Sequence, residues 1–345
     1  MRFQNFLFNS GKFSRLTTTC VGICLLIFSA FVVGRAQDPE DVITTDTALV
    51  QLNIGVVDRQ GRPITSLTKN DFAVYEDGVK QTIQRFEPVE APFSLVLMLD
   101  MSGSTINFRQ QLKLASQRFL DALAPEDRVS VVQFDARVKP LTSFSTDRSK
   151  TAYAISIADG KGETHLYEAL RYALRELDKE GKRRKAIVVL TDGLDSDMRI
   201  KDRRTVANAQ TDQEALTAVN AQGIADLNQI ISSADRQGVS IFPLALPSGD
   251  PKRLPIQDPN ITGIYAAARL RLQALSDRTG GRLNEIDRLE HMAQLYREVA
   301  ASIRTLYTIG YQANGERVRG KWHEIKIEVP NQDLTARTKP GYFGR

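Results

Sequence analysis

The sequence predicts an α/β fold built on a doubly wound, mostly parallel sheet, with a small β-rich module beside it. Two observations support this prediction. Uninterrupted apolar runs at residues 95–99 and 186–190 are typical of strands that are buried on both faces of a sheet. Segments with helical periodicity alternate with such runs, and this alternation favours a parallel sheet with helices on both faces.

The predicted strands and helices of the α/β fold begin after residue 93. Helices are predicted where apolar residues recur every three or four positions, and strands where β-branched and apolar residues cluster. The expected strands are 95–99, 129–134, 138–144 at the sheet edge, 186–190 and 240–246. The expected helices are 107–123, 166–177, 265–276 and 289–306.

Alternating segments flank this region on both sides. Residues 48–91 contain a strand-like segment at 49–57 and two shorter ones, separated by turn sequences. Residues 305–345 contain three more short strands, which are too few to fold alone. We therefore expect the two flanks to build one β-rich module around the α/β domain at 92–304.

The first 36 residues have the features of an export signal. Basic residues precede the apolar stretch 20–33, and small residues at Gly34 and Ala36 suit a signal peptidase. The stretch is shorter than the roughly 20 residues of a typical membrane span. We expect a cleaved signal peptide at 1–36, or an uncleaved inner-membrane anchor, followed by a linker at 37–47. Either reading places the body in the periplasm or outside the cell.

Charge and cysteine content narrow the function classes. The net charge of +5 arises mainly in the leader, because the remaining chain has 42 basic and 41 acidic residues. A nearly neutral body argues against nucleic-acid binding. The two cysteines, Cys20 and Cys24, both lie in the leader, so the body has no disulfide or thiol chemistry.

Oxygen-bearing side chains gather where two of the predicted strands end. Asp100 follows one apolar run and Asp192 another, and Ser102 and Ser104 continue from the first. Ligands bind at the carboxyl ends of strands in such sheets, and oxygen ligands suit a hard divalent cation. Thr164, before the helix at 166–177, could add a fifth oxygen.

Each of these hydroxyl residues also has a purely structural interpretation. Ser and Thr are common helix N-caps, and any one of Ser102, Ser104 or Thr164 could serve a helix instead of a metal. Five oxygen residues that converge from three loops are hard to explain by capping alone. The pattern therefore predicts a metal site.

These residues resemble the von Willebrand factor type A family. Asp100-Met101-Ser102-Gly103-Ser104 matches the Asp-x-Ser-x-Ser motif of its metal-ion-dependent adhesion site, Thr164 its lone threonine, and Thr191-Asp192-Gly193 its third segment. The resemblance covers residues 93–300, with an insertion near 199–223. It implies a Rossmann-like domain, and the flanks, including 71–78, look like an exported bacterial subgroup.

By this resemblance the site would hold Mg²⁺, with Mn²⁺ or Ca²⁺ as substitutes. Ser102 and Ser104 would bind the ion directly, and Asp100 and Asp192 largely through water, while Thr164 would join or leave with the conformational state. An exposed Asp or Glu of a partner protein would complete the coordination. The resemblance thus implies an exported, non-enzymatic adhesion or scaffold module that contacts a membrane only through an uncleaved leader.

Three further residues are candidates for lining the site: Glu163, His165 and Asp195. Glu163 stands where many family members have a small residue. Its carboxylate could occupy the open metal position or tune the affinity for a ligand.

Two alternatives use the same residues or the same family. A cell-envelope hydrolase would use Ser102 or Ser104 as nucleophile, but the Gly-x-Ser-x-Gly pattern is absent and His165 is the only histidine near the motif. An assembly factor acting beside an AAA-type ATPase would be cytosolic, which the leader argues against.

Overall fold

The computed structural model describes residues 49–89, 91–219, 225–247, 258–286, 288, 291–313 and 320–344. The predicted leader at 1–36 and linker at 37–47 lie outside these residues. Among the helices within the described ranges, none has the length and apolarity needed to cross a bilayer.

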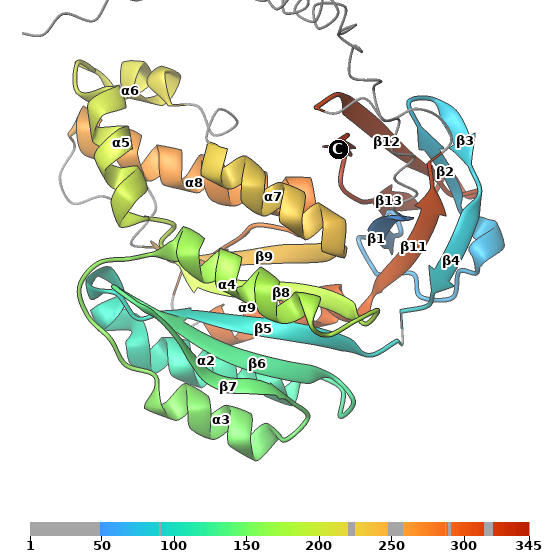
Figure 1. The fold of residues 1–345 in the computed structure, drawn as a ribbon, viewed down its shortest axis with the longest axis horizontal. Coiled ribbons are helices and arrows are strands. Elements are labelled where there is room, and N and C mark those ends of the chain that lie inside the picture. Colours follow the sequence, from blue (N-terminus) through green and yellow to red (C-terminus); the bar gives the residue numbers. More distant parts are fainter. Residues whose placement is uncertain are drawn as a thin grey trace, which may run out of the picture. The chain divides into compact units, whose positions relative to one another are not determined.

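A six-stranded sheet forms the centre of the α/β domain (Figure 1). Its strand order is β10-β9-β8-β5-β6-β7, and every pairing is parallel except that of β6 with the edge strand β7. This confirms the predicted doubly wound, mostly parallel sheet. The strands are β5 (Phe93–Asp100), β6 (Arg128–Phe134), β7 (Val138–Ser145), β8 (Arg184–Thr191), β9 (Val239–Ala245) and β10 (Asn284–Glu285).

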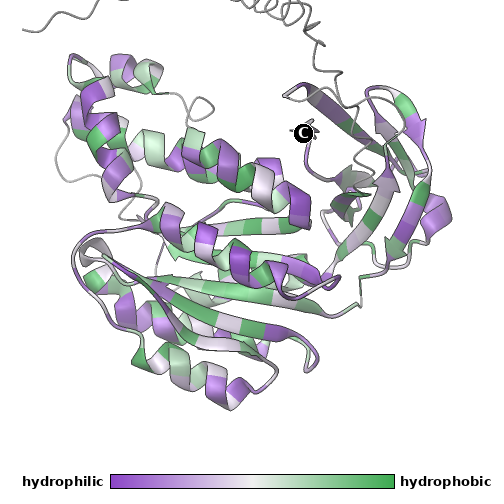
Figure 2. Ribbon diagram, in the orientation of Figure 1, coloured by the Kyte–Doolittle hydropathy of each residue, from purple (hydrophilic) through white to green (hydrophobic). Residues whose placement is uncertain are grey.

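Helices cover both faces of the sheet because its strands are apolar on both sides. All eight residues of β5 and all eight of β8 are buried. One face packs against α2 (Arg109–Asp121), α3 (Arg148–Ile157) and α9 (Met292–Arg304). The other packs against α4 (Leu166–Asp178), α7 (Ala225–Gln237) and α8 (Pro259–Thr279). Figure 2 shows the central strands mainly hydrophobic and the helices striped with polar residues.

The predicted insertion near 199–223 overlaps α5 (Ser196–Val206), which begins before it, and contains α6 (Asp212–Ala218). They pack on α8 through a small apolar cluster that includes Val206, Ala215 and Ile264. A buried ion pair fixes α5 on α8, with Arg271 Nη1 donating to Asp202 Oδ1 at 2.9 Å. The insertion is thus attached to the helix that also supports β9.

The β-rich module consists of two antiparallel sheets, β13-β1-β11-β4 and β14-β12-β2-β3. Strands from before and after the α/β domain pair directly, as in Leu52 with Ile309 and Val74 with Ile327. Their apolar side chains share one core. The strands are β1 (Leu49–Val57), β2 (Ala73–Glu76), β3 (Val79–Gln81), β4 (Ile83–Glu87), β11 (Leu306–Gln312), β12 (Trp322–Glu328), β13 (Thr335–Arg337) and β14 (Gly341–Phe343).

Arg184 connects the two chain segments that pass between the module and the α/β domain. Its guanidinium donates to the carbonyls of Val89 and Ala91 at 2.8 and 3.0 Å, and to those of Ile303 and Leu306 at 3.0 and 2.6 Å. Burial lowers the pKa of Arg184 to about 10, so the side chain stays charged at neutral pH.

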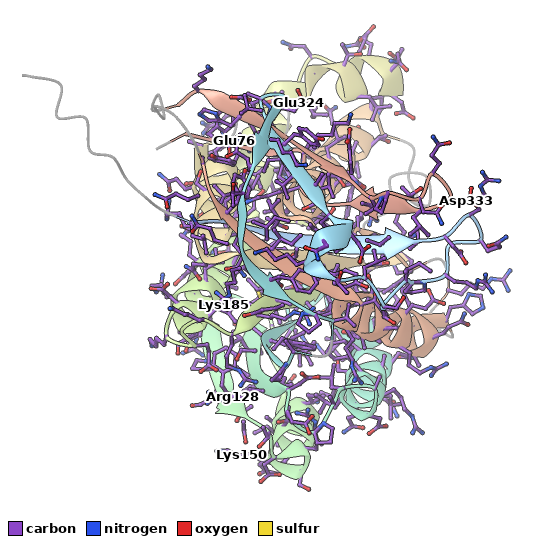
Figure 3. All side chains as sticks on the ribbon, turned by 90° about the vertical axis from the view of Figure 1, so that its right-hand side faces the viewer. Glu76, Arg128, Lys150, Lys185, Glu324 and Asp333 are labelled. Carbon is purple, nitrogen blue, oxygen red and sulfur yellow. The ribbon has the colours of Figure 1, made fainter. Side chains whose placement is uncertain are left out.

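Arg184 begins β8 at the amino edge of the central sheet. In Figure 3, which faces this edge, Lys185 of β8 and Arg128 of β6 lie in the lower half, and Glu76 and Glu324 of the module lie above them. The four acceptors of Arg184 are main-chain groups, so the contact depends on the path of the two connections and not on their side chains.

We predict that Arg184→Met lowers the free energy of unfolding by about 3 kcal/mol, because four carbonyls would lose their charged donor. Urea unfolding of the two proteins measures the difference. Lys182→Met is the matched control, since this neighbouring side chain is exposed. A loss of less than about 1 kcal/mol in Arg184→Met would contradict the assigned role.

Candidate metal centre

Asp100 and Asp192 lie at the ends of neighbouring strands. Asp100 is the last residue of β5, and Asp192 directly follows β8. These strands pair in parallel up to Leu99 and Leu190, so both carboxylates emerge at the carboxyl edge. The chain winds outward in opposite directions from β5 and β8, and ligand sites in doubly wound sheets form at this switch point.

Asp100 is fully buried and accepts three hydrogen bonds. The main-chain N–H and the hydroxyl of Ser102 donate to Oδ1 at 3.0 and 2.6 Å, and the Thr191 hydroxyl donates to Oδ2 at 2.7 Å. The carboxylate is therefore held by the loop that follows its own strand and by the end of β8.

Asp192 is also buried, but only one of its oxygens is satisfied. Oδ1 accepts the N–H of Leu194 at 3.0 Å, whereas Oδ2 is buried and has no hydrogen-bond partner in the described part of the chain. Gly193 permits the turn, because its φ is +87° and a Cβ there would lie 2.8 Å from Leu272. A buried carboxylate oxygen without a donor is costly unless a cation or water binds it.

Burial makes both carboxylates hold protons more tightly. Burial, followed by the charge of Asp192, raises the pKa of Asp100 to about 7. Burial also raises the pKa of Asp192, although the Ser104 hydroxyl and the Arg269 cation oppose it. A bound divalent cation would remove this repulsion.

The two motif serines face the carboxylates and do not cap a helix. Ser102 precedes the 3₁₀ helix Gly103–Phe108, but its side chain makes no capping hydrogen bond. Its hydroxyl instead contacts Asp100 and lies 3.1 Å from the Ser104 hydroxyl. The capping interpretation is therefore wrong for Ser102 in this structure.

The loop that carries Thr164 is anchored beside the motif loop. Gly103 N–H donates to the Gly162 carbonyl at 3.0 Å. Thr164 is buried, and its main chain exchanges hydrogen bonds with Ser196, from N–H to Ser196 Oγ at 3.0 Å and from Ser196 N–H to its carbonyl at 2.9 Å. The N-cap position of α4 is His165, not Thr164.

The three candidate lining residues are used differently. Glu163 is 70% exposed, and its carboxylate lies 3.8 Å from the His165 imidazole, which is 25% exposed. Asp195 caps α5 by accepting from Asp197 and Met198 N–H, and its second oxygen accepts from Tyr167 N–H at 3.2 Å. Asp195 thus links the first turns of α4 and α5 by accepting hydrogen bonds from main-chain N–H groups of both helices.

Two further residues support the site, although neither is among the predicted metal ligands or lining residues. The Thr191 hydroxyl joins β8 to Asp100, and its signal was a lone hydroxyl at the end of an apolar strand. Arg109 donates to the carbonyl of Met101 at 2.7 Å and to that of Gly160, and so joins the motif loop to the loop before Thr164. No local pattern identifies Arg109, because its acceptors are main-chain carbonyls.

The residues at this edge fit a divalent cation. Two buried carboxylates, an unsatisfied oxygen on Asp192 and the hydroxyls of Ser102 and Ser104 form an all-oxygen donor set, which Mg²⁺ prefers. Within the described ranges no cluster of three or more His, Cys, Asp or Glu residues could hold a metal ion. A site here would therefore depend on hydroxyls as well as carboxylates.

Comparisons with known proteins identify the family of this segment. Residues 95–194 match the model of the von Willebrand factor type A domain. Among solved structures, the chain is similar to a von Willebrand factor type A protein from Catenulispora acidiphila, with 13% identity, 86% of this chain and 74% of that chain covered, and a TM-score of 0.46.

Two other solved structures are similar at a comparable level. One is the von Willebrand factor domain of the type V pili tip protein Mfa5 from Porphyromonas gingivalis, with 15% identity, 62% of this chain and 95% of that chain covered, and a TM-score of 0.45. The other is proximal thread matrix protein 1 from the mussel byssus, described with a zinc-occupied MIDAS motif. It has 13% identity and a TM-score of 0.42, with 66% of this chain and 49% of that chain covered.

The family model spans the strands and loops that carry Asp100, Ser102, Ser104, Thr164 and Asp192. Residues 95–194 of this chain belong to the von Willebrand factor type A domain family.

Proposed function

We propose that this chain is an exported protein-binding module, an adhesion or scaffold protein, whose α/β domain recognises an acidic side chain of a partner through a bound divalent cation. The observation that carries the proposal is the buried pair Asp100 and Asp192, one of whose oxygens has no donor, at the switch point of the sheet. Two buried carboxylates of raised pKa favour a cation between them.

Ser102, Ser104, Asp100, Asp192 and Thr164 would hold the ion, with Mg²⁺ as first choice and Mn²⁺ or Ca²⁺ as substitutes. When bound, the ion would supply an electrophilic contact for an outside carboxylate. Mg²⁺ keeps several water ligands when few protein oxygens bind it, and a partner's Asp or Glu can replace one of these waters. The chain's own residues would position the ion.

A hydrolytic function has weaker support. A serine nucleophile needs a base within hydrogen-bond distance. The histidine base of a serine hydrolase is not in place in the described part of the chain, because the His165 imidazole lies beside Glu163 and forms no hydrogen bond with Ser102 or Ser104. The Ser102 hydroxyl instead donates to Asp100, a carboxylate of the proposed metal site. These contacts favour a binding role over catalysis.

The proposed location outside the cytoplasm rests on the leader sequence. Basic residues, an apolar stretch and a small-residue cleavage site precede the described part of the chain. The same leader argues against a cytosolic partner such as an AAA-type ATPase.

We predict that Asp100→Ala abolishes Mg²⁺ binding while the fold is retained. Removing the carboxylate takes away one of two buried negative charges and the acceptor of the Ser102 and Thr191 hydroxyls. Titration calorimetry measures binding, and circular dichroism checks the fold. Asp197→Ala is the matched control, because this carboxylate is exposed in the first turn of α5. Undiminished Mg²⁺ binding by Asp100→Ala would exclude the site.

The pH dependence of stability provides a second prediction. The pKa of Asp100 is about 7 in the fold, above its ordinary value of 3.8, so the folded state holds an extra proton between these values. Without metal, this group should therefore make the protein less stable as pH rises from about 4 to about 7, by up to about 1.4 kcal/mol for each pKa unit.

Urea unfolding in EDTA across this pH range measures the effect, with Asp100→Asn as the control that removes the titration. The difference in the free energy of unfolding between the two proteins should grow with pH in EDTA, and this dependence on pH should shrink in saturating Mg²⁺. A difference that does not change with pH would show that Asp100 is not buried as a charged group.

Partner binding is predicted to require both the metal and the motif. Wild-type protein should recover a set of partners from a cell-envelope extract in Mg²⁺ that it does not recover in EDTA, and Asp100→Ala should not recover this set in either condition. Binding should also fail after carboxylates of the extract are blocked by amidation. The same partners with and without EDTA would refute metal-bridged recognition.

A further inference from the structure

Helices α4 and α7 lie on the same face of the central sheet (Figure 1). Side chains of these two helices line a groove of about 520 Å³. Its lining includes Arg171 and Arg175 of α4 and Arg236 of α7, with Leu174 and Ile230 as apolar residues between them. No lining residue is acidic. The groove is therefore lined by basic, uncharged polar and apolar side chains.

The groove is separate from the candidate metal centre. α4 begins next to Thr164 at the carboxyl edge of the sheet and ends before β8 starts at the opposite edge. Arg175 lies in the last turn of α4, and Arg236 in the last turn of α7, which leads into β9. Two of the three cations thus lie towards the amino edge of the strands.

The three guanidinium groups are not neutralised within the described residues. Arg236 donates to the Ser233 hydroxyl at 2.6 Å, and Arg175 lies over the Tyr172 ring at 5.7 Å. None of Arg171, Arg175 and Arg236 forms an ion pair with a carboxylate of the described chain. Three guanidinium groups in one groove form a strong site for an anionic ligand.

Three carboxylates on these helices already pair with lysines, whereas Glu168 and Asp178 of α4 form no ion pair within the described residues. Glu176 contacts Lys179 at 2.5 Å, Asp226 contacts Lys201 at 3.7 Å, and Asp235 contacts Lys339 at 2.9 Å. Asp235 and Lys339 are both buried side chains, so this acid cannot turn towards the groove without leaving a buried lysine unpaired. The lining of the groove thus carries three cations and no acid.

We propose that this groove binds an acidic segment of a partner polypeptide, in which two or more Asp or Glu side chains pair with the three arginines. Arg171 and Arg175 are four residues apart on one helix, which places their Cβ atoms about 6 Å apart on one face. Arg236 contributes from the facing helix. This spread of cations matches several carboxylates along a chain.

The lining favours a polypeptide over phosphate or a lipid surface. Gln229 and Gln237 line the groove beside Ser232, and their amides and hydroxyl can pair with peptide N–H and C=O groups. A phosphate site would be expected to use free main-chain N–H groups at a helix start. The arginines lie within or near the ends of helices and not at their first turns. A recessed groove also suits a chain segment better than a flat array of headgroups.

The test uses the full chain and a fluorescein-labelled peptide of alternating Asp and Glu residues, in EDTA so that no metal site contributes. Fluorescence anisotropy should show saturable binding at low salt. The double variant Arg171→Glu/Arg175→Glu should weaken binding by about tenfold or more, because two charge-assisted contacts become repulsive.

Arg203→Glu/Arg204→Glu is the matched control, since it makes the same change in net charge at two exposed positions of α5. It should leave binding within about twofold of wild type if the contacts are local. Equal loss in both double variants would show a non-specific charge effect and overturn the site. Stronger competition by inorganic phosphate or by phosphatidylglycerol vesicles than by unlabelled peptide would also overturn it.

Discussion

The parallel pairing of β5 with β8 is the constraint on which both the fold and the candidate site depend. It places Leu99 opposite Leu190, so that Asp100 and Asp192 emerge side by side from a core in which both strands are wholly buried. The apolar strands stabilise the sheet, and the same burial destabilises two adjacent carboxylates. Burial in the hydrophobic core therefore makes the negative charges of these two carboxylates unfavourable. A divalent cation bound between them would stabilise both charges.

A second buried charge ties the domain to the strands that flank it. Arg184 lies at the opposite end of β8 from Asp192 and donates to main-chain carbonyls on both connections to the β-rich module. Asn53 adds a link from β1, because its amide donates to the Gly238 carbonyl at 3.0 Å, just after α7. Strand β8 thus begins with Arg184, which binds both connections to the β-rich module, and is followed directly by Asp192 of the candidate metal site.

Charge is distributed so that the two proposed binding surfaces do not interfere. The acids of the metal centre are buried at the carboxyl edge, whereas the arginines of the α4–α7 groove are accessible on a helical face. At physiological salt, charges separated by more than about 8 Å are largely screened where solvent is present. A partner with an acidic segment could therefore meet a cation at one surface and guanidinium groups at the other, and the two contacts can be separated with EDTA.

Sequence alone determined the fold class and the strands that carry the motif, because long apolar runs and their period are local properties. It predicted neither α3 nor α7. The apolar residues of α3 do not form one stripe, because Ala154 and Ile155 are buried whereas Tyr153 and Ile157 are exposed. Only the tertiary structure decided that Ser102 serves Asp100 and not a helix, that Asp195 braces α4, and that Thr191 and Arg184 are structural partners. Each of these roles depends on an acceptor or donor whose position follows from how separate loops and strands are brought together, and spacing along the chain does not encode that geometry.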